Sequence, residues 1–514
     1  MKDKIIVSNH QELESKYGNA GWVAIHKALN DLVAADSKRG INSKIVYLDK
    51  NSDMKKLNGN AVMNHLDPLE NKKAIDDIFK FYEPHYLMIL GSHDIIPHQD
   101  INNPVYNRES VRGGGDVHAF GDLPYACDAP YSRDPAMFVG PTRVVGRLPD
   151  LVGDNNPSYL ICLIKTATKY KTRTPSEYAS YLGLSAEIWQ GSTQLSLNNI
   201  FGNTNKLLLA PPSGPNYPNN ELQTLMHFIN CHGGLASPEF LGQRGNTYHT
   251  ALTTQLITGK IHEGTIASAE CCYGAQLYDS ITLITDKPIC QSYLEQGAYG
   301  FFGSTTIAYG PPNGNGAADL ICQYFLHHVL NGASVGEAAL MARQDFVYQT
   351  GQMDPIDLKT LSQFNLLGDP SIHPVIQTSA TVIPKTMKMG IAEQNSRVER
   401  RNKMKAMGSF LTDTKPTASK ESPSGKISQQ TMTVLSNISK IAGLTSKQEF
   451  TVFDVKETPM SKSLLAKDTK ISIRYLITIG IPKIKTIEKI NQGIAVVARE
   501  LNGRIVDYRI YHQR

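Results

Sequence analysis

Short apolar runs alternate with amphipathic helical stretches along the first 375 residues, and this alternation limits the fold more than any other feature. Residues 22–39 carry apolar side chains at helical spacing and are followed by a β-rich run at 44–50; residues 72–83 and the apolar run 85–93 repeat the pattern. Continuous apolar runs are typical of strands that are buried on both faces of a parallel sheet. The alternation therefore predicts a doubly wound α/β fold.

A second helix-and-strand series follows an irregular region that opens with the glycine-rich residues 112–117. Its predicted elements are strands at 224–231, 265–270 and 300–305, a helix at 250–259, and a helix that begins at the capping-box match Ser334-Val-Gly-Glu337. We expect an N-terminal α/β subdomain over residues 1–150 and a second, catalytic one over 151–375. They could be two sheets or two halves of one sheet.

The character of the sequence changes beyond Pro374. Residues 376–430 are rich in Ser, Thr, Lys, Met and Pro without a sustained apolar period, which predicts a flexible basic linker. Residues 431–514 regain periodicity and predict a small basic α+β domain with an antiparallel sheet. Its expected elements are strands at 451–456, 470–480 and 504–512 and a helix at 486–500.

The charge is divided unevenly along the chain. Residues 381–514 hold 24 Lys and Arg against 11 Asp and Glu, a net charge of +13, so the first 380 residues sum to −8 within the total of +5. A basic tail on an acidic body favours an acidic partner for the C-terminal domain. The alternative explanation, that the charge only keeps a small domain soluble, stays open.

The cysteine content and the hydropathy indicate a cytoplasmic protein. Seven cysteines, an odd number without small-scaffold spacing, favour free thiols in a reducing compartment. The N-terminal residues have no signal-like apolar run, and no stretch of 18 apolar residues occurs in the sequence. We expect no association with a membrane.

Two of the predicted strands end in reactive side chains. Residues 226–231 lead into His232 and Gly233, and residues 265–269 lead into Glu270, Cys271 and Cys272. In open α/β sheets, ligands bind outside the carboxyl ends of the strands, so neighbouring parallel strands would bring these side chains to one cleft.

A thiol, an imidazole and close-approaching backbone amides are what a cysteine peptidase needs. Cys272 would attack the peptide carbonyl, His232 would protonate the leaving amine, and the amides of Gly233 and Cys272 would bind the oxyanion. Adjacent Cys-His and Cys-Cys pairs lack the spacing of zinc ligands, so we expect neither a metal nor another cofactor.

The sequence resembles the caspase-like cysteine peptidases, and among them most closely the gingipain type. The resemblance rests on the His-Gly and Glu-Cys-Cys-Tyr-Gly motifs and on five further blocks in family order, at residues 86–97, 121–128, 145–149, 297–310 and 364–371. It implies two stacked α/β subdomains and strict selectivity for the residue before the cut. The missing secretion signal and a different C-terminal region are departures from gingipains and favour an intracellular, regulated peptidase.

The resemblance also implies roles for single residues. An acidic residue two places before the nucleophile, as in legumains and metacaspases, selects Cys272 with Glu270 behind it, although Cys271 stays an alternative nucleophile. Glu270 would be the counter-charge for an Arg or Lys side chain, with Cys271 beside it in the substrate site, unless it forms a structural salt bridge.

Four other residues are weaker candidates. Ser304 and Thr305 would line the pocket, unless they only terminate their strand. Asp122 or Asp128 would orient the histidine as a third catalytic residue, unless they serve turns.

The sequence therefore predicts a cysteine endopeptidase that cuts polypeptides after Arg or Lys and processes itself in the basic segment 399–403. The rival hypothesis is a non-catalytic caspase-like scaffold whose basic C-terminal domain binds an acidic partner or nucleic acid. Because that domain has no aromatic RNA-binding signature, nucleic acid is not the expected partner.

Overall fold

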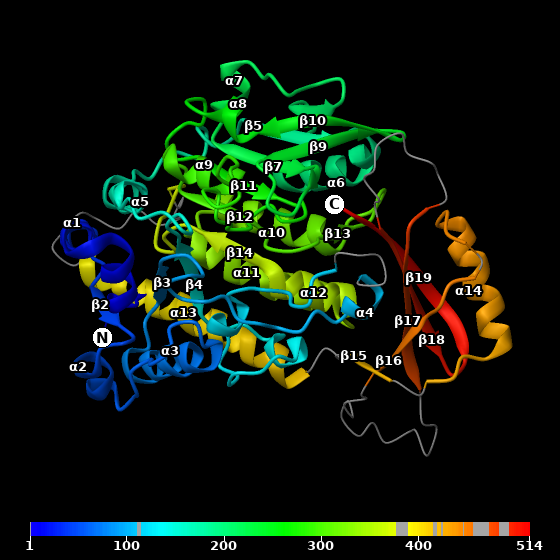
Figure 1. Ribbon diagram of the computed structural model, residues 1–514, viewed down its shortest axis with the longest axis horizontal. Coiled ribbons are helices and arrows are strands. Elements are labelled where there is room, and N and C mark those ends of the chain that lie inside the picture. The colour runs from blue at the N-terminus through cyan, green and yellow to red at the C-terminus, as the bar shows by residue number, and fades with distance from the viewer. Residues whose placement is uncertain are drawn as a thin grey trace.

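One ten-stranded sheet runs through the body of the molecule, with the strand order β2-β1-β3-β4-β14-β12-β11-β7-β5-β6 (Figure 1). All neighbours are parallel except β12 and β14, which pair antiparallel. The two expected subdomains are thus two halves of one sheet. Because the strand direction reverses between β14 and β12, the carboxyl ends of the two halves lie at opposite edges.

The structure is a computed structural model, and it describes residues 2–109, 115–376, 389–414, 419–422, 425–445, 447–455, 472–482 and 493–514. The glycines at 113–115 of the predicted irregular region lie largely outside these residues. The strands of the N-terminal half are β1 Lys4–Ser8, β2 Ser43–Tyr47, β3 Tyr86–Leu90, β4 Val144–Leu148 and β14 Phe364–Leu367. Those of the catalytic half are β5 Tyr181–Ala186, β6 Leu207–Ala210, β7 Met226–Asn230, β11 Ile266–Ala269 and β12 Gly300–Ser304.

Helices cover both faces of the sheet, as a doubly wound fold requires. On one face lie α1 His10–Lys38, α5 Ser158–Lys169 and α9 Ile289–Glu295; on the other lie α6 Gln190–Phe201, α10 Ala317–Leu330 and α11 Val335–Thr350. Further helices are α2 Asn51–Met54, α3 Pro68–Tyr82, α4 Tyr106–Glu109, α7 Asn219–Leu222, α8 Thr254–Ile257 and α12 Pro355–Gln363. The predicted capping box opens α11: Ser334 Oγ accepts from Glu337 N at 3.1 Å, and Ser334 N donates to Glu337 Oε2 at 3.0 Å. None of the described helices is both long and apolar enough to cross a bilayer.

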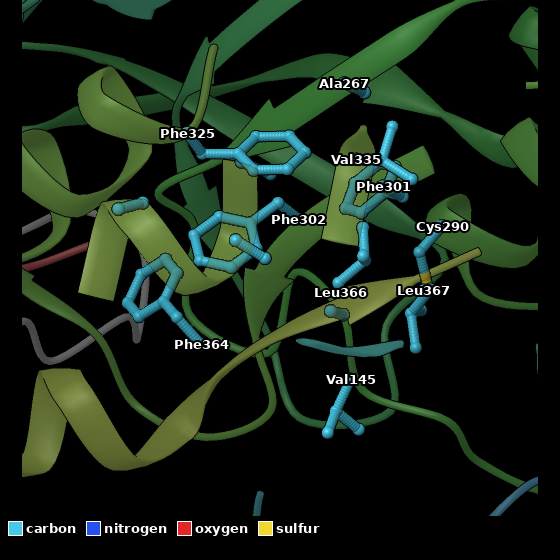
Figure 2. Close-up of a cluster of buried hydrophobic side chains, with 14 of the residues drawn as sticks. Val145, Ala267, Cys290, Phe301, Phe302, Phe325, Val335, Phe364, Leu366 and Leu367 are labelled. Atoms are coloured by element: carbon cyan, nitrogen blue, oxygen red, sulfur yellow. The ribbon is translucent and has the colours of Figure 1, made fainter. Parts of the chain in front are cut away.

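An aromatic cluster joins the two halves of the sheet. Phe302 on β12 stacks on Phe325 of α10 with ring centroids 4.6 Å apart, and Phe364 on β14 packs 5.8 Å from Phe302 (Figure 2). All three side chains are fully buried. Interiors packed in this way deform little, so β12 and the neighbouring strand β11 are held rigidly.

A second, six-stranded antiparallel sheet has the order β13-β19-β18-β17-β16-β15. Its strands are β13 Tyr309–Gly310, β15 Ser419–Glu421, β16 Thr451–Val455, β17 Ile473–Gly480, β18 Ile494–Leu501 and β19 Arg504–Gln513, and α14 Gln429–Ile441 packs beside it. Because β13 belongs to the catalytic body, the C-terminal sheet is continued onto that body (Figure 1).

The expected helix at 486–500 is wrong where the structure describes it, since β18 occupies 494–501. The run Ile494-Ala-Val-Val-Ala pairs with strands on both sides and is buried on both faces, and its β-branched residues suit a strand. Residues 483–492 lie outside the described part of the chain.

The range expected to be a flexible linker contains a long helix, α13 Met389–Thr414. Met404 and Leu411 are buried against the body, and Arg400 Nε pairs with Glu337 Oε1 at 2.9 Å. Two buried apolar residues seven apart give no sustained sequence period, so the sequence did not reveal the helix. Residues 377–388, 415–418 and 423–424 of the expected linker lie outside the described residues.

Candidate active site

The ends of β7 and β11 converge as the sequence predicted. The two strands are parallel neighbours with Ile229 opposite Ala269, and Glu270 N donates to Ile229 O at 2.9 Å. Just beyond, a Cβ atom on Gly233 would lie only 1.8 Å from Cys272 O, so this approach of the two main chains requires glycine. His232 and Cys272 are therefore delivered to one place.

Strand alternation separates the two adjacent cysteines. On β7, His227 contacts Tyr293 of α9 at 2.8 Å, whereas Asn230 Nδ2 faces Asp319 of α10 at 3.4 Å. Cys271 lies on the α9 side, with its Sγ 4.0 Å from Ile229 O.

Cys272 faces the other way. Its Sγ accepts from Ala308 N at 3.2 Å, in the loop that leads into β13. Cys272 therefore lies beside Ala308 and Arg514, and Cys271 lies on the α9 side.

His232 is held by a glutamine. Its Nε2 lies 2.7 Å from Gln243 Oε1, while Gln243 Nε2 donates to Gly245 O at 2.6 Å. Because the amide nitrogen is used as a donor, Oε1 accepts, so the imidazole proton is on Nε2 and Nδ1 is left unprotonated. The ring lies 4.3 Å from the Trp189 ring and 5.1 Å from that of Tyr248. Burial lowers the pKa of His232 to about 3.

Gln243 and Tyr248 belong to a β-hairpin that the sequence analysis missed. Strands β9 Glu239–Arg244 and β10 Thr247–Thr253 pair antiparallel, and β9 also pairs with the short strand β8 His232–Gly233. The helix expected at 250–259 is reduced to α8, the four residues 254–257. The missed signal is the two-residue turn Gly245-Asn246 between β-rich runs.

Neither aspartate expected beside the histidine is there. Asp122 binds Arg147 through both oxygens, at 2.6 and 2.8 Å, and His98 at 3.0 Å. Asp128 binds Arg143 and Thr142, each at 2.9 Å. The expectation of a third, acidic residue is wrong because both carboxylates neutralise arginines of the N-terminal half.

Ser304 and Thr305 use their hydroxyls on main-chain carbonyls. Ser304 Oγ donates to Thr306 O at 2.8 Å, and Thr305 Oγ1 donates to Phe120 O. These bonds hold the chain that follows β12. They agree with the alternative that Ser304 and Thr305 only terminate their strand.

Residues 512–514 lie beside Cys272 and the short strand β13. Strand β19 pairs antiparallel with β13, with Gln513 opposite Tyr309 and His512 opposite Gly310. Arg514 N donates to Ala308 O at 3.0 Å, and Cys272 N donates to Arg514 O at 3.3 Å. Figure 1 shows β19 running from the C-terminal sheet to this point. A main-chain carbonyl therefore occupies the position expected for the oxyanion.

The Arg514 side chain fills a closed pocket. Its Nη2 lies 2.8 and 2.9 Å from the two carboxylate oxygens of Asp319 and 2.9 Å from Pro311 O. The guanidinium lies over the Trp189 ring, 4.3 Å from its centroid. A Cβ atom on Gly310 would come within 2.4 Å of Nη2, so Gly310 makes room for the guanidinium.

Glu270 lies in this pocket but is not the nearest carboxyl group. Its Oε2 is 3.9 Å from Arg514 Nε, and burial, with Asp319 nearby, raises its pKa well above the ordinary value. The sequence analysis missed Asp319, whose signal was a carboxylate in the first turn of the apolar helix α10.

Comparisons with known proteins identify the catalytic half. Residues 223–375 match the model of peptidase family C25. No curated protein sequence matches the chain. The structure is similar to a crystal structure of the Arg-specific cysteine proteinase gingipain R, with 13% identity, a TM-score of 0.48, and 73% of this chain and 78% of that chain covered. A structure described as a protease has the same identity and TM-score, with 99% and 97% covered.

Proposed function

Because residues 223–375 match peptidase family C25, the expected resemblance to gingipain-type enzymes is confirmed and the chain is a cysteine peptidase; we propose that it cuts polypeptides after arginine. The observation that carries this specificity is the pocket around the Arg514 side chain. Asp319, Trp189 and Gly310 supply a charge, an aromatic face and a gap that match a guanidinium.

The pocket favours arginine over lysine. Nη2 reaches both oxygens of Asp319 and also Pro311 O, and the planar group stacks on Trp189. A lysine ammonium cannot stack in this way and sits on a different stem. Charge-assisted hydrogen bonds contribute about 1.5–3 kcal/mol each. We expect lysine substrates to be cut more slowly, by about 10- to 100-fold.

The dyad would act as follows. Nδ1 of His232 takes the thiol proton of Cys272 as the sulfur attacks the arginine carbonyl, and the N–H groups of Cys272 and Gly233 stabilise the oxyanion. The C–N bond then breaks, and His232 gives the proton to the leaving amine. Water hydrolyses the thioester and restores the thiol. The 3.3 Å contact of Cys272 N with the Arg514 carbonyl supports this placement.

Two neighbouring cysteines offer a matched test of the nucleophile. Cys272→Ala should lower kcat/KM on an arginyl peptide by about 10⁴-fold or more, as loss of a nucleophile does in other hydrolases. Cys271→Ala should change it by less than about 3-fold, because that thiol lies outside the cleft. Both are measured in chains that also carry Arg514→Ala, which empties the pocket. The reverse outcome would assign the nucleophile to Cys271.

Self-processing in the segment 399–403 is part of the proposal, with a condition that the structure adds. The segment lies within α13, where Arg400 pairs with Glu337 and Arg401 contacts Glu83. Peptidases bind extended chains, so α13 would have to unwind first. Mass spectrometry should find new ends after Arg400 or Arg401 in the wild type and not in Cys272→Ala. An intact chain in a preparation that hydrolyses arginyl peptides would exclude this cut.

The proposal also retains a cytoplasmic location and an acidic partner for the basic C-terminal region. The partner would bind through charge, so its affinity should fall steeply with salt and be unchanged by Cys272→Ala. The test is a titration of the Cys272→Ala chain with an acidic polypeptide at two salt concentrations. Salt-independent affinity would exclude a charge-driven partner.

A further inference from the structure

The C-terminal tail is bound in the manner of a peptide substrate. Residues 512 and 513 add a strand to β13, which is the common way of holding an extended peptide. Arg514 then places its side chain in the pocket, its N–H on Ala308 O and its carbonyl on the Cys272 amide. A substrate would be positioned by its side chain, its N–H group and its carbonyl. Arg514 of the same chain makes all three of these contacts.

We propose that residues 512–514 are an internal inhibitor of the peptidase and that the tail has to leave the cleft before a polypeptide enters. This inference rests on the proposed function. It goes further in assigning the resting state of the enzyme and in making the C-terminal domain the part that controls access.

The C-terminal domain holds the tail at the cleft through a few polar contacts with α12. Tyr511 Oη donates to Asp354 Oδ2 at 3.1 Å, and Arg509 Nη1 lies 3.3 Å from Asp357 Oδ2. A tethered ligand acts at an effective concentration that reaches the millimolar range. Even a tripeptide of modest affinity then outcompetes most substrates.

The tail also leaves the dyad in an unreactive form. Cys272 and Trp189 are buried in the presence of Arg514, and His512 and Arg514 both lie close enough to His232 to disfavour its charged form. Burial raises the pKa of the Cys272 thiol to about 12. Because the thiolate is the nucleophile, a buried neutral thiol supports a resting enzyme.

The bound arginine is held incompletely, as a removable ligand would be. Nε and Nη1 of Arg514 make no hydrogen bond among the described residues, and the nearest Glu270 oxygen lies 3.9 Å from Nε. Buried polar groups are normally paired. Because these groups are not, they lose few hydrogen bonds when the tail moves out and water enters.

The first test compares the hydrolysis of an arginyl fluorogenic peptide by the wild type, Arg514→Ala and Arg504→Ala. Arg504 begins the same strand and is exposed, so it is the matched control. Arg514→Ala should raise kcat/KM at least about 10-fold, because the vacant fraction of enzyme rises from a tenth or less to nearly one. Arg504→Ala should stay within about 2-fold, and Arg514→Lys should lie between the two.

The second test measures binding without catalysis. In chains carrying Cys272→Ala, a fluorescein-labelled Tyr-His-Gln-Arg peptide is titrated with and without Arg514→Ala and followed by anisotropy. Adding Arg514→Ala should tighten binding at least about 10-fold. Circular dichroism checks that each variant is folded.

The outcomes separate the inference from the proposed function. Tighter binding without hydrolysis by any variant supports the inhibitor and refutes the peptidase activity on arginine. Equal hydrolysis by the wild type and Arg514→Ala, or equal peptide binding with and without Arg514→Ala, overturns the inhibitor. Both results can be read from folded, full-length chains.

Discussion

Two buried arginines, Arg147 on β4 of the N-terminal half and Arg514 beside the ends of β7 and β11, differ in how completely their side chains are paired. Arg147 on β4 uses all three of its nitrogens: Nε and Nη2 bind Asp122, and Nη1 binds Gly91 O and Ile96 O. Arg514 bonds through Nη2 alone. All three nitrogens of the Arg147 guanidinium are thus paired, whereas the Arg514 guanidinium is paired through one.

The carboxyl groups beside the two arginines differ in the same sense. Burial alone would raise the pKa of Asp122, but Arg147 and His98 hold it well below its usual value. In the catalytic half, burial and the neighbouring Asp319 raise the pKa of Glu270. In the first site the cations outweigh the cost of burying the carboxylate, whereas in the second burial and a neighbouring carboxylate outweigh the effect of Arg514.

The largest expected effect is on stability in the N-terminal half. Asp122→Ala leaves Arg147 charged and buried without a counter-charge, which costs about 3–5 kcal/mol of unfolding free energy. Asp128→Ala is the control, because the Asp128 side chain is 52% exposed and such pairs contribute about 1 kcal/mol or less. Denaturant unfolding measures both. Equal losses would mean that the Arg147 pair is no more structural than a surface pair.

The next effect is on specificity in the catalytic half. Asp319→Asn, in the Arg514→Ala background, should lower kcat/KM on arginyl peptides by about 10- to 100-fold, since charge-assisted hydrogen bonds are lost. Hydrolysis of lysyl peptides should fall as well. The ratio of kcat/KM on arginyl peptides to that on lysyl peptides should become smaller. Profiling a peptide library measures both. An unchanged arginine preference would assign the pocket to another carboxyl group.

A smaller effect is expected where the two halves each hold a histidine. His98 is bound by the carboxylate of Asp122, and His232 by the amide of Gln243. Gln243→Ala should lower kcat about 10-fold with little change in KM, because the imidazole loses its fixed tautomer. Gln243→Glu should restore much of kcat and move the acid limb of the pH profile to higher pH, since a carboxylate stabilises the imidazolium. An unshifted limb would show that Gln243 only packs against the ring.

The smallest effect is expected at Glu270. Burial and the neighbouring Asp319 raise the pKa of Glu270 and so favour its neutral form, and Glu270→Gln should therefore change kcat/KM by less than about 3-fold. A carboxyl whose folded pKa exceeds the unfolded value near 4.5 stabilises fully below that value, and this contribution is lost as the pH rises towards the folded pKa. The free energy of unfolding of the wild type should therefore fall relative to that of Glu270→Gln between pH 5 and 8. If the unfolding free energies of the wild type and of Glu270→Gln depend on pH in the same way, Glu270 is ionised.

Local sequence patterns predicted much of the catalytic half. Uninterrupted apolar runs placed β7, β11 and β12, and the rule that ligands bind beyond the carboxyl ends of parallel strands brought His232 and Cys272 together. These inferences succeed because a strand and the residue that follows it are contiguous in sequence. Patterning was ambiguous where an apolar run suits both periods, as at residues 494–501.

The pocket and the histidine partner could not be predicted in the same way. Asp319, Trp189 and Gln243 come from α10, the segment after β5, and a hairpin, each an isolated polar or aromatic residue in its own stretch. The sequence does not show that they face one cleft. The tail is the extreme case, because nothing in His512-Gln513-Arg514 indicates that these residues contact Cys272 and Ala308.

The sequence by itself determined the α/β architecture and the delivery of an imidazole and a thiol to one edge, because hydrophobic periodicity and strand direction are local properties. The tertiary structure alone shows which way each cysteine faces, which carboxylate meets Arg514, and that residues 512–514 lie beside Cys272. Those features depend on contacts between segments up to hundreds of residues apart, such as Asp319 with Arg514, which only packing of the whole chain specifies.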